Sequence, residues 1–235
     1  MAGSIPVACA GTSGSHASEK IRKVVAPGLI PVDVPDASSA VDGNPDPDPG
    51  LDAGVDAPPP ANIGLSRGTD TPADQALAEG DAAYLAGQWD KAAAAYARAK
   101  VLDPKDPAPL VGQVRTTLAR HDVPTAHAAA PDHPELKKAL VILRRALALD
   151  AKYGPAHLEV GRALLVMNRA NEAVASLRSA VQFSARDPES HSALGVALLG
   201  IGKGQEAVEA LRRSAELDPH NAARQSNLGT ALLLR

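Results

Sequence analysis

The sequence predicts an all-α protein, a solenoid of antiparallel helix pairs preceded by a disordered N-terminal segment. The first observation is a repeat: Gly161 and Gly195 are separated by the same interval as Ala173 and Ala207. This interval of about 34 residues is typical of stacked helical hairpins. The second is composition, because 45% of the residues are hydrophobic but only 2% are aromatic, and alanine favours thin, closely packed helices. The third is a change of composition near residue 72, which predicts two unlike parts, 1–72 and 73–235.

The N-terminal part, residues 1–72, is predicted to be a disordered tether rich in proline, aspartate and alanine. No lysine or arginine lies between Val25 and Ser66, and aspartates alternate with prolines there. Such a segment buries too little apolar surface to offset its chain entropy. A calcium loop at 42–53 is the alternative, but Pro47 and Ala53 occupy the places that need glycine and a bidentate glutamate.

Residues 73–235 divide into four repeat units and part of a fifth. The predicted units are 73–106, 107–153 with an insertion at 121–133, 154–187, 188–221 and the partial unit 222–235. Each is expected to contain two helices. Glycines such as Gly161 would let the two helices of a hairpin approach closely, with alanines such as Ala173 on the facing helix. Gly87, Asn168 and Gly202 stand between the helices, where a left-handed residue ends the first one.

The spacing of these small and large residues resembles the tetratricopeptide repeat, over residues 73–235. Counting from the start of each unit, the pattern has a small residue at places 8, 20 and 27 and proline at place 32. The first unit holds Gly80, Ala92, Ala99 and Pro104 at these places. The resemblance implies a right-handed superhelix whose first helices line a concave groove. It also implies a non-catalytic scaffold that binds a protein or peptide partner.

The groove residues follow from the resemblance, which places them at positions 2, 5, 9 and 12 of the first helices. The predicted peptide-groove residues are Val111, Arg115, Leu118, Leu158, Arg162, Leu165, Val196 and Leu199. Their composition suits an amphipathic helix or an extended peptide anchored by aliphatic side chains. Arg115 and Arg162 are expected to grip an acidic side chain or a terminal carboxylate.

The second unit departs from the pattern, since its second helix comes later in the chain than the repeat period predicts. The excess predicts a loop at 121–133, which carries His121, His127 and His133. A zinc or nickel site is the alternative to a solvated loop, but prolines in this segment prevent a helix that would align two imidazoles. We therefore predict no metal and no cofactor.

Other function classes find little support in the sequence. The formal charge of −3 argues against nucleic acid as a partner, and no apolar run approaches the roughly 20 residues that span a bilayer. There is no phosphate-binding glycine loop, nucleophile elbow or HExxH pair, so no enzyme is expected. The alternative is a structural or oligomerising module of a cell-envelope assembly. Leu232, Leu233 and Leu234 indicate either a longer array or self-association through the C-terminal helix.

The single cysteine bears on localisation. The stretch from Ile5 to Gly11 resembles the end of a bacterial lipoprotein signal, in which Cys9 would be lipidated and act as a membrane tether. Pro6 departs from that pattern, and the preceding segment is short. An envelope protein, lipid-anchored or periplasmic, is the expectation, and a cytoplasmic protein is the alternative.

Overall fold

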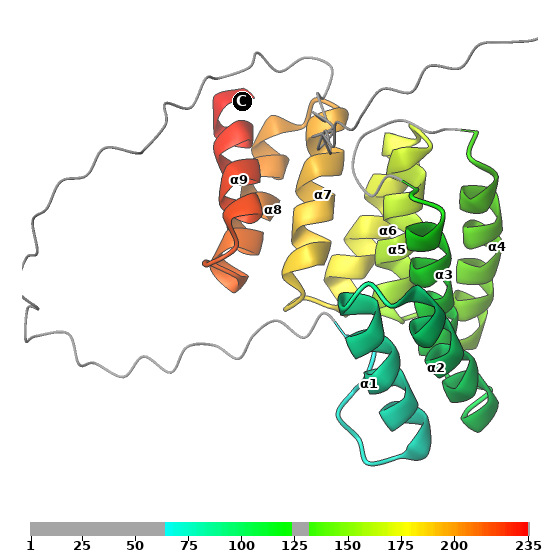
Figure 1. The fold of residues 1–235 in the computed structure, drawn as a ribbon. Coiled ribbons are helices and arrows are strands. Elements are labelled where there is room, and N and C mark those ends of the chain that lie inside the picture. The colour runs from blue at the N-terminus through cyan, green and yellow to red at the C-terminus, as the bar shows by residue number, and fades with distance from the viewer. Residues whose placement is uncertain (1–63, 124–131, 235) are drawn as a thin grey trace, which may run out of the picture. The chain divides into compact units, whose positions relative to one another are not determined.

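The computed structural model describes residues 64–123 and 132–234. This part of the chain holds nine α-helices and no strand. The helices are α1 (Pro72–Leu85), α2 (Trp89–Leu102), α3 (Ala108–Arg120), α4 (Pro134–Leu149), α5 (Gly154–Val166), α6 (Ala170–Phe183), α7 (Pro188–Gly200), α8 (Gly204–Leu217) and α9 (Ala222–Leu234). The predicted all-α class is confirmed for these residues (Figure 1).

The helices form a solenoid of antiparallel pairs, in which each helix packs against the next one in the chain. The first helices of the pairs, α1, α3, α5, α7 and α9, also contact one another in succession. Among the described residues, no such contact joins the second helices α2, α4, α6 and α8. The first helices therefore form the more closely spaced layer, which is the layer that the sequence assigns to the groove.

Local signals in the sequence explain where the helices begin and end. Pro72, Pro134 and Pro188 open α1, α4 and α7, where a missing backbone N–H leaves no helical hydrogen bond unmade. Gly87, Asn168 and Gly202 have φ of 69°, 59° and 76°, so the predicted left-handed residues end the first helices of three hairpins. The short loops that follow turn the chain back at once, which makes the pairs antiparallel.

The predicted close approach of helices at glycine is present in the first, third and fourth hairpins. A β-carbon at Gly80 would meet the ring of Tyr96, one at Gly161 would meet Leu177, and one at Gly195 would meet Leu211. These three bulky side chains are almost fully buried. Each hairpin thus carries one large side chain wedged against a bare stretch of the facing helix, and burial of that side chain stabilises the pair.

Residues 64–71 correct the predicted boundary at residue 72. We call this segment the strap. Instead of belonging to a disordered tether, it runs beside α1 (cyan in Figure 1) and is held by hydrogen bonds to Asp74 and Asp81. Leu65 of the strap is buried in the same apolar cluster as Leu77 and Val111. The sequence missed this because the strap has no helical period, and its partners are carboxylates that lie later in the chain.

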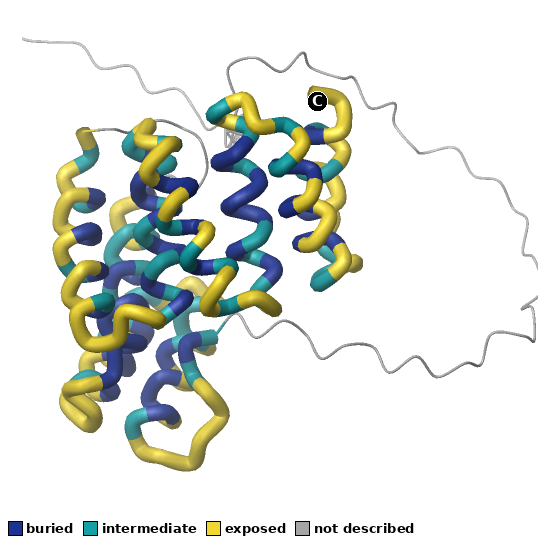
Figure 2. The backbone as a smooth tube through the Cα atoms, turned by 180° about the vertical axis from the view of Figure 1, so that it is seen from behind, coloured by how far each residue is buried: buried dark blue, intermediate teal, exposed yellow. Residues whose placement is uncertain are grey.

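Buried residues lie on the facing sides of the helices (Figure 2). Their side chains form two large clusters. One runs from the strap to α5, and the other from the end of α3 to α8. Leu118 and Val160 pack against both clusters. The two halves of the array therefore meet at α3 and α5, which is also where the candidate site lies.

Candidate peptide-binding site

A cavity of about 310 Å³ opens on the layer of first helices. Its lining residues come from the strap, from α1, α3, α5 and α7, and from the loop before α7. They are Gly64, Asp81, Tyr84, Leu85, Arg115, Pro155, Leu158, Arg162, Ser184, Asp187 and Glu189. The volume is at the lower end of the range for ligand sites, and it suits one or two side chains of a peptide.

The cavity brings together only some of the predicted groove residues. Arg115, Leu158 and Arg162 line it. Leu118 lines a smaller neighbouring cavity of about 30 Å³, which shares Tyr84, Arg115 and Arg162 with the first. The other half-buried predicted residues line neither of these two cavities and instead pack against the core: Leu165, Val196 and Leu199.

Two predicted groove residues have partners within the protein. Val111 is fully buried, in the same apolar cluster as Leu65 and Leu77. Arg115 lines the cavity, and its Nε donates a hydrogen bond to Oε1 of Glu159 at 2.6 Å. Spacing within one repeat predicts the direction of a side chain from its own helix, but it does not show what covers it.

The Arg115–Glu159 pair is buried between α3 and α5, with side-chain exposures of 12% and 6%. Burial alone would raise the pKa of Glu159 and lower that of Arg115. The attraction between the two charges outweighs burial, so the pKa of Glu159 lies below its usual range and that of Arg115 above. Both groups are therefore ionised at neutral pH.

This pair begins a ladder of alternating charges that crosses the layer of first helices. Arg162 lies 3.8 Å from Glu159 and 3.6 Å from Glu189. Arg224 of α9 then pairs with Glu189 at 3.3 Å and with Asp218 at 2.8 Å. The charges thus connect α3, α5, α7 and α9 in order.

Among these charged residues, Arg162 has guanidinium N–H groups that can still donate hydrogen bonds to a ligand. Its two ion pairs are too long for hydrogen bonds, and its guanidinium donates none to any other described residue. The side chain is 27% exposed and lines both cavities. A guanidinium has five N–H donors in a planar fork, so a carboxylate or carbonyl entering the cavity would find donors there.

The carboxylates of the cavity already have partners in the protein. Asp81 accepts hydrogen bonds from the backbone N–H groups of Leu65 and Ser66 and from the hydroxyl of Tyr96. Asp187 caps α7 by accepting from the backbone N–H groups of Glu189 and Ser190. The acidic groups at this site therefore serve the fold, and the cationic head of Arg162 remains for a ligand.

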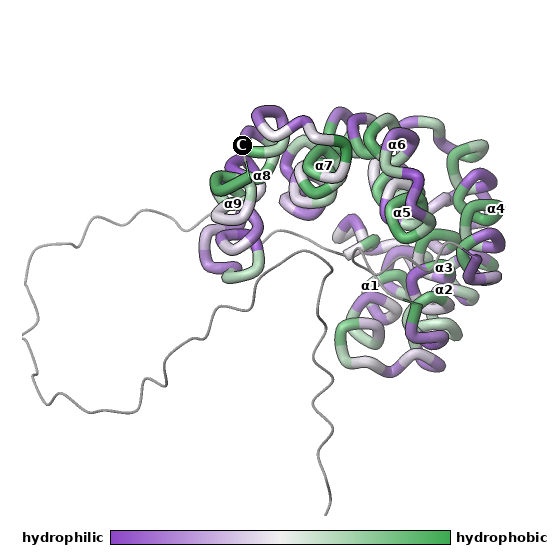
Figure 3. The backbone as a smooth tube through the Cα atoms, turned by 90° about the horizontal axis from the view of Figure 1, so that it is seen from above, coloured by the Kyte–Doolittle hydropathy of each residue, from purple (hydrophilic) through white to green (hydrophobic). Residues whose placement is uncertain are grey.

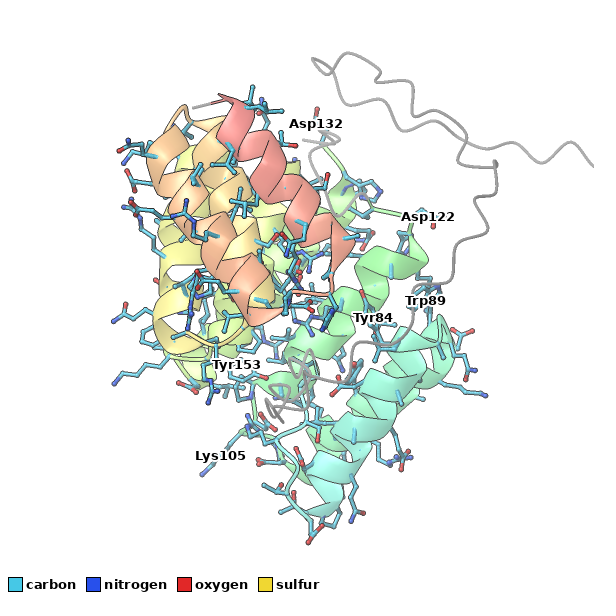
Figure 4. The ribbon with its side chains drawn as sticks, turned by 90° about the vertical axis from the view of Figure 1, so that its left-hand side faces the viewer. Tyr84, Trp89, Lys105, Asp122, Asp132 and Tyr153 are labelled. Carbon is cyan, nitrogen blue, oxygen red and sulfur yellow. The ribbon has the colours of Figure 1, made fainter. Side chains whose placement is uncertain are left out.

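Sequence reasoning missed several wall residues. Leu85 and Ser184 lie near helix ends, outside the places that the repeat pattern marks. Glu159 precedes Arg162 by three residues on α5, and this spacing is typical of ion pairs on a helix. It is the sequence signal that could have identified Glu159 as part of the site. Tyr84 also lines the cavity, and its ring packs against that of Trp89 with centroids 5.3 Å apart (Figure 4). Both aromatic residues belong to the first hairpin.

His157 and His191 hold the same place in successive repeat units, and both have a structural role. The ring Nε2 of His157 lies 3.0 Å from the carbonyl oxygen of Ala151, and that of His191 lies 2.9 Å from that of Ala185. Gln225, one repeat period after His191, donates to the carbonyl of Pro219 at 3.3 Å. At each of these places the side chain thus fastens the first turn of a helix to the loop six residues earlier.

Some predicted features fall on or beyond the edges of the described chain. His121 ends α3, and His133 precedes α4, where its Nδ1 accepts from the backbone N–H of Glu135. Cys9 and His127 lie outside the described residues, so lipidation of Cys9 stays a prediction. No helix among the described residues is both long and apolar enough to span a bilayer.

Comparison with known proteins supports the fold. PilF of Pseudomonas aeruginosa matches with a TM-score of 0.55 at 20% identity, over 68% of each chain. The chain has the tetratricopeptide-repeat fold. TTC0263 of Thermus thermophilus, described as a tetratricopeptide-repeat protein, matches with a TM-score of 0.45 at 24% identity, over 68% of this chain and 99% of its own.

A third solved structure, MamA of Desulfovibrio magneticus RS-1, matches with a TM-score of 0.49 at 19% identity, over 68% of this chain and 84% of its own. No protein-family model matches the sequence, and no curated protein matches it. At these identities the similarity concerns the tetratricopeptide-repeat fold alone, so function is argued below from the site.

Proposed function

We propose that this tetratricopeptide-repeat protein is a non-catalytic scaffold that captures a peptide or helix of a partner protein in the 310 Å³ cavity. The observation that carries the proposal is Arg162, a half-buried cation with unused donors beside the apolar walls formed by Leu85 and Leu158. A peptide that presents an aliphatic side chain next to an acidic group would satisfy both.

The physical argument concerns what a ligand gains at this site. Leu85 is 74% exposed, so covering it with an aliphatic side chain removes apolar surface from water. A carboxylate that replaces water at Arg162 forms charge-assisted hydrogen bonds in a partly enclosed site, where they are stronger than in water. An acidic residue alone or an apolar residue alone would make only half of these contacts.

The test is selection of peptides from a random display library against the full chain, followed by titration of the enriched peptides. We expect acidic and aliphatic residues to be enriched together. Arg162→Glu and Leu85→Asp should each weaken binding by at least about tenfold, which corresponds to about 1.4 kcal/mol. Failure to enrich such peptides would contradict the proposal.

Matched control variants lie on other faces of the same array. Arg178 of α6 is 54% exposed and pairs with Glu206, and Val101 of α2 is 78% exposed. Neither lines the cavity. Arg178→Glu and Val101→Asp should therefore leave peptide binding unchanged, and an equal loss in both pairs of variants would show that the cavity is not the site.

A second candidate function is a structural module that self-associates through α9. Leu233 and Leu234 are 87% and 63% exposed, and Figure 3 shows a hydrophobic stretch in this helix beside α8. A β-carbon at Gly229 would meet nothing within 4 Å, whereas the equivalent Gly195 receives Leu211. Light scattering of the wild-type chain and of Leu233→Glu tests this role, since a strictly monomeric wild type would rule it out.

A further inference from the structure

We propose that the surface beside α1, where the strap lies, is a second peptide-binding site, filled in cis by residues 64–69. The ligand it takes is a short peptide with an aliphatic residue two positions before an arginine and a glycine directly after the arginine, because Gly68 of the strap has a φ of 71°. In this chain Leu65 and Arg67 fill those roles. The site differs from the Arg162 cavity, although Gly64 also contributes to the wall of that cavity.

The strap is held through its backbone, as a bound peptide is. Two carboxylates of α1 accept its N–H groups: Asp81 accepts from Leu65 at 2.6 Å and from Ser66 at 2.9 Å. Asp74 accepts from Arg67 at 2.7 Å and from Thr69 at 2.6 Å. These hydrogen bonds do not depend on the side chains of Leu65, Ser66 and Thr69. Gly68, between two of the donors, has a φ of 71°, so a bound segment needs a residue there that tolerates this turn.

Two side chains of the strap supply specificity. Leu65 is 3% exposed and belongs to the cluster of Leu77 and Val111. Arg67 donates two hydrogen bonds to Asp106, at 2.9 and 2.8 Å, and its guanidinium lies 5.7 Å from the centre of the Tyr153 ring. A bidentate pair fixes the direction as well as the position of the arginine.

The receptor side of the site is built from the helical array. Asp74 is 4% exposed and Asp106 is 7% exposed. These exposures are those of the chain with the strap in place. Without the strap, Asp74 would lose the hydrogen bonds from Arg67 and Thr69, and Asp106 would lose those from Arg67 while keeping the one from the backbone N–H of Ala108. Both carboxylates belong to the helical array, so they can accept N–H groups and a guanidinium from a segment of another chain as well as from the strap.

The experiment uses the full chain and a labelled synthetic peptide with the sequence of residues 64–70, GLSRGTD. The strap is released by the double substitution Leu65→Asp and Arg67→Glu. We expect the peptide to bind this variant saturably and to bind the wild type at least about tenfold more weakly, because a tethered segment competes at an effective concentration near millimolar. Fluorescence anisotropy measures both.

The control peptide carries the same two substitutions and should not bind the released variant. Binding of both peptides alike, or of neither to a released variant that keeps its helical circular dichroism, would overturn the proposal. If the released variant loses helical structure, the readout is recovery of the helical signal with added peptide. Recovery with GLSRGTD and not with the control supports the proposal, and no recovery overturns it.

Removal of one charge tests the arginine contact separately. The released variant with the further substitution Asp106→Asn should lose most of its preference for GLSRGTD over a peptide in which arginine is replaced by glutamate, because Asp106 is the partner of that arginine. Arg162→Glu in the released variant should leave binding of GLSRGTD unchanged, because Arg162 forms its ion pairs with Glu159 and Glu189, whereas the side chains of Leu65 and Arg67 bind elsewhere. The two proposals can therefore fail separately. If no peptide is selected for the Arg162 cavity, binding of GLSRGTD to the released variant still supports the strap site. If GLSRGTD does not bind, the proposal for the cavity is unaffected.

Discussion

Single residues set how closely the helices of each hairpin approach. Gly195 faces Leu211, and a β-carbon there would also come within 3.1 Å of the carbonyl oxygen of Ala207. Gly229 holds the same place in the last unit, and a β-carbon there would meet nothing within 4 Å. Identical residues at equivalent places thus have opposite surroundings, which makes them a matched pair.

Gly195→Ala is expected to destabilise the fold, and Gly229→Ala to stabilise it. Alanine in a helix is worth roughly 0.5 to 1 kcal/mol over glycine, which is the whole effect expected at Gly229. At Gly195 the forced shift of Leu211 should cost about 1 to 3 kcal/mol and outweigh that gain. Urea unfolding of both variants measures the difference. A stabilised Gly195→Ala variant would contradict the close packing of Leu211 against Gly195.

At the scale of one element, the strap depends on ionised carboxylates. Burial would raise the pKa of Asp74, but the N–H groups of Arg67 and Thr69 outweigh it, so the pKa lies below its usual range. For Asp106, burial is outweighed by the hydrogen bonds from Arg67, and its pKa is lowered as well. A lowered pKa in the folded state means that stability is present above the ordinary value and is lost as pH falls through the folded value.

Asp74→Asn should therefore destabilise the protein at pH 7 and matter less in acid. An amide oxygen accepts from the strap without charge, and its NH₂ group faces other donors, so we expect a cost of about 1 to 3 kcal/mol. Below the folded pKa the wild type loses the same charge, and the difference between the two proteins should shrink. Urea unfolding at pH 7 and near pH 3 tests this, and a constant difference would contradict it.

At the scale of the whole described array, two apolar clusters meet at α3 and α5, where the Arg115–Glu159 pair is buried. In a solenoid, stability is approximately a sum over neighbouring units, so cooperation between the halves depends on this junction. The alternating charges that continue to α9 fix the order of the helices along the same layer.

Arg115→Met should uncouple the two halves, because it removes the hydrogen-bonded partner of the buried Glu159 and leaves Arg162, at 3.8 Å, as its remaining cation. We expect a cost approaching about 3 kcal/mol. Trp89 is the single tryptophan and lies in the first hairpin, so its fluorescence reports one half while far-ultraviolet circular dichroism reports the whole. The two urea transitions should coincide in the wild type and separate in the variant.

The matched control for this prediction is the double variant Arg115→Met with Glu159→Leu. Replacing a buried ion pair by apolar side chains of similar size is often close to neutral, so coincident transitions should return. If Arg115→Met unfolds in one step with nearly unchanged stability, then the pair does not join the halves.

By itself, the sequence determined the helical hairpins, because they depend on residues that recur at fixed intervals. The glycines beside Tyr96, Leu177 and Leu211 and the left-handed Asn168 are predictable from the repeat period. Three of the predicted groove residues also line the cavity, since the period fixes the face of each first helix.

Only the tertiary structure decided which of those positions a ligand can reach. Val111 is buried in a cluster that includes Leu65 of the strap, and Arg115 forms an ion pair with Glu159, so both depend on segments far apart in the chain. Periodicity describes one helix relative to its own axis, whereas burial and ion pairing depend on what a separate segment brings to that surface. For that reason the hairpins follow from the sequence, whereas the strap and the N–H donors that Arg162 leaves unused do not.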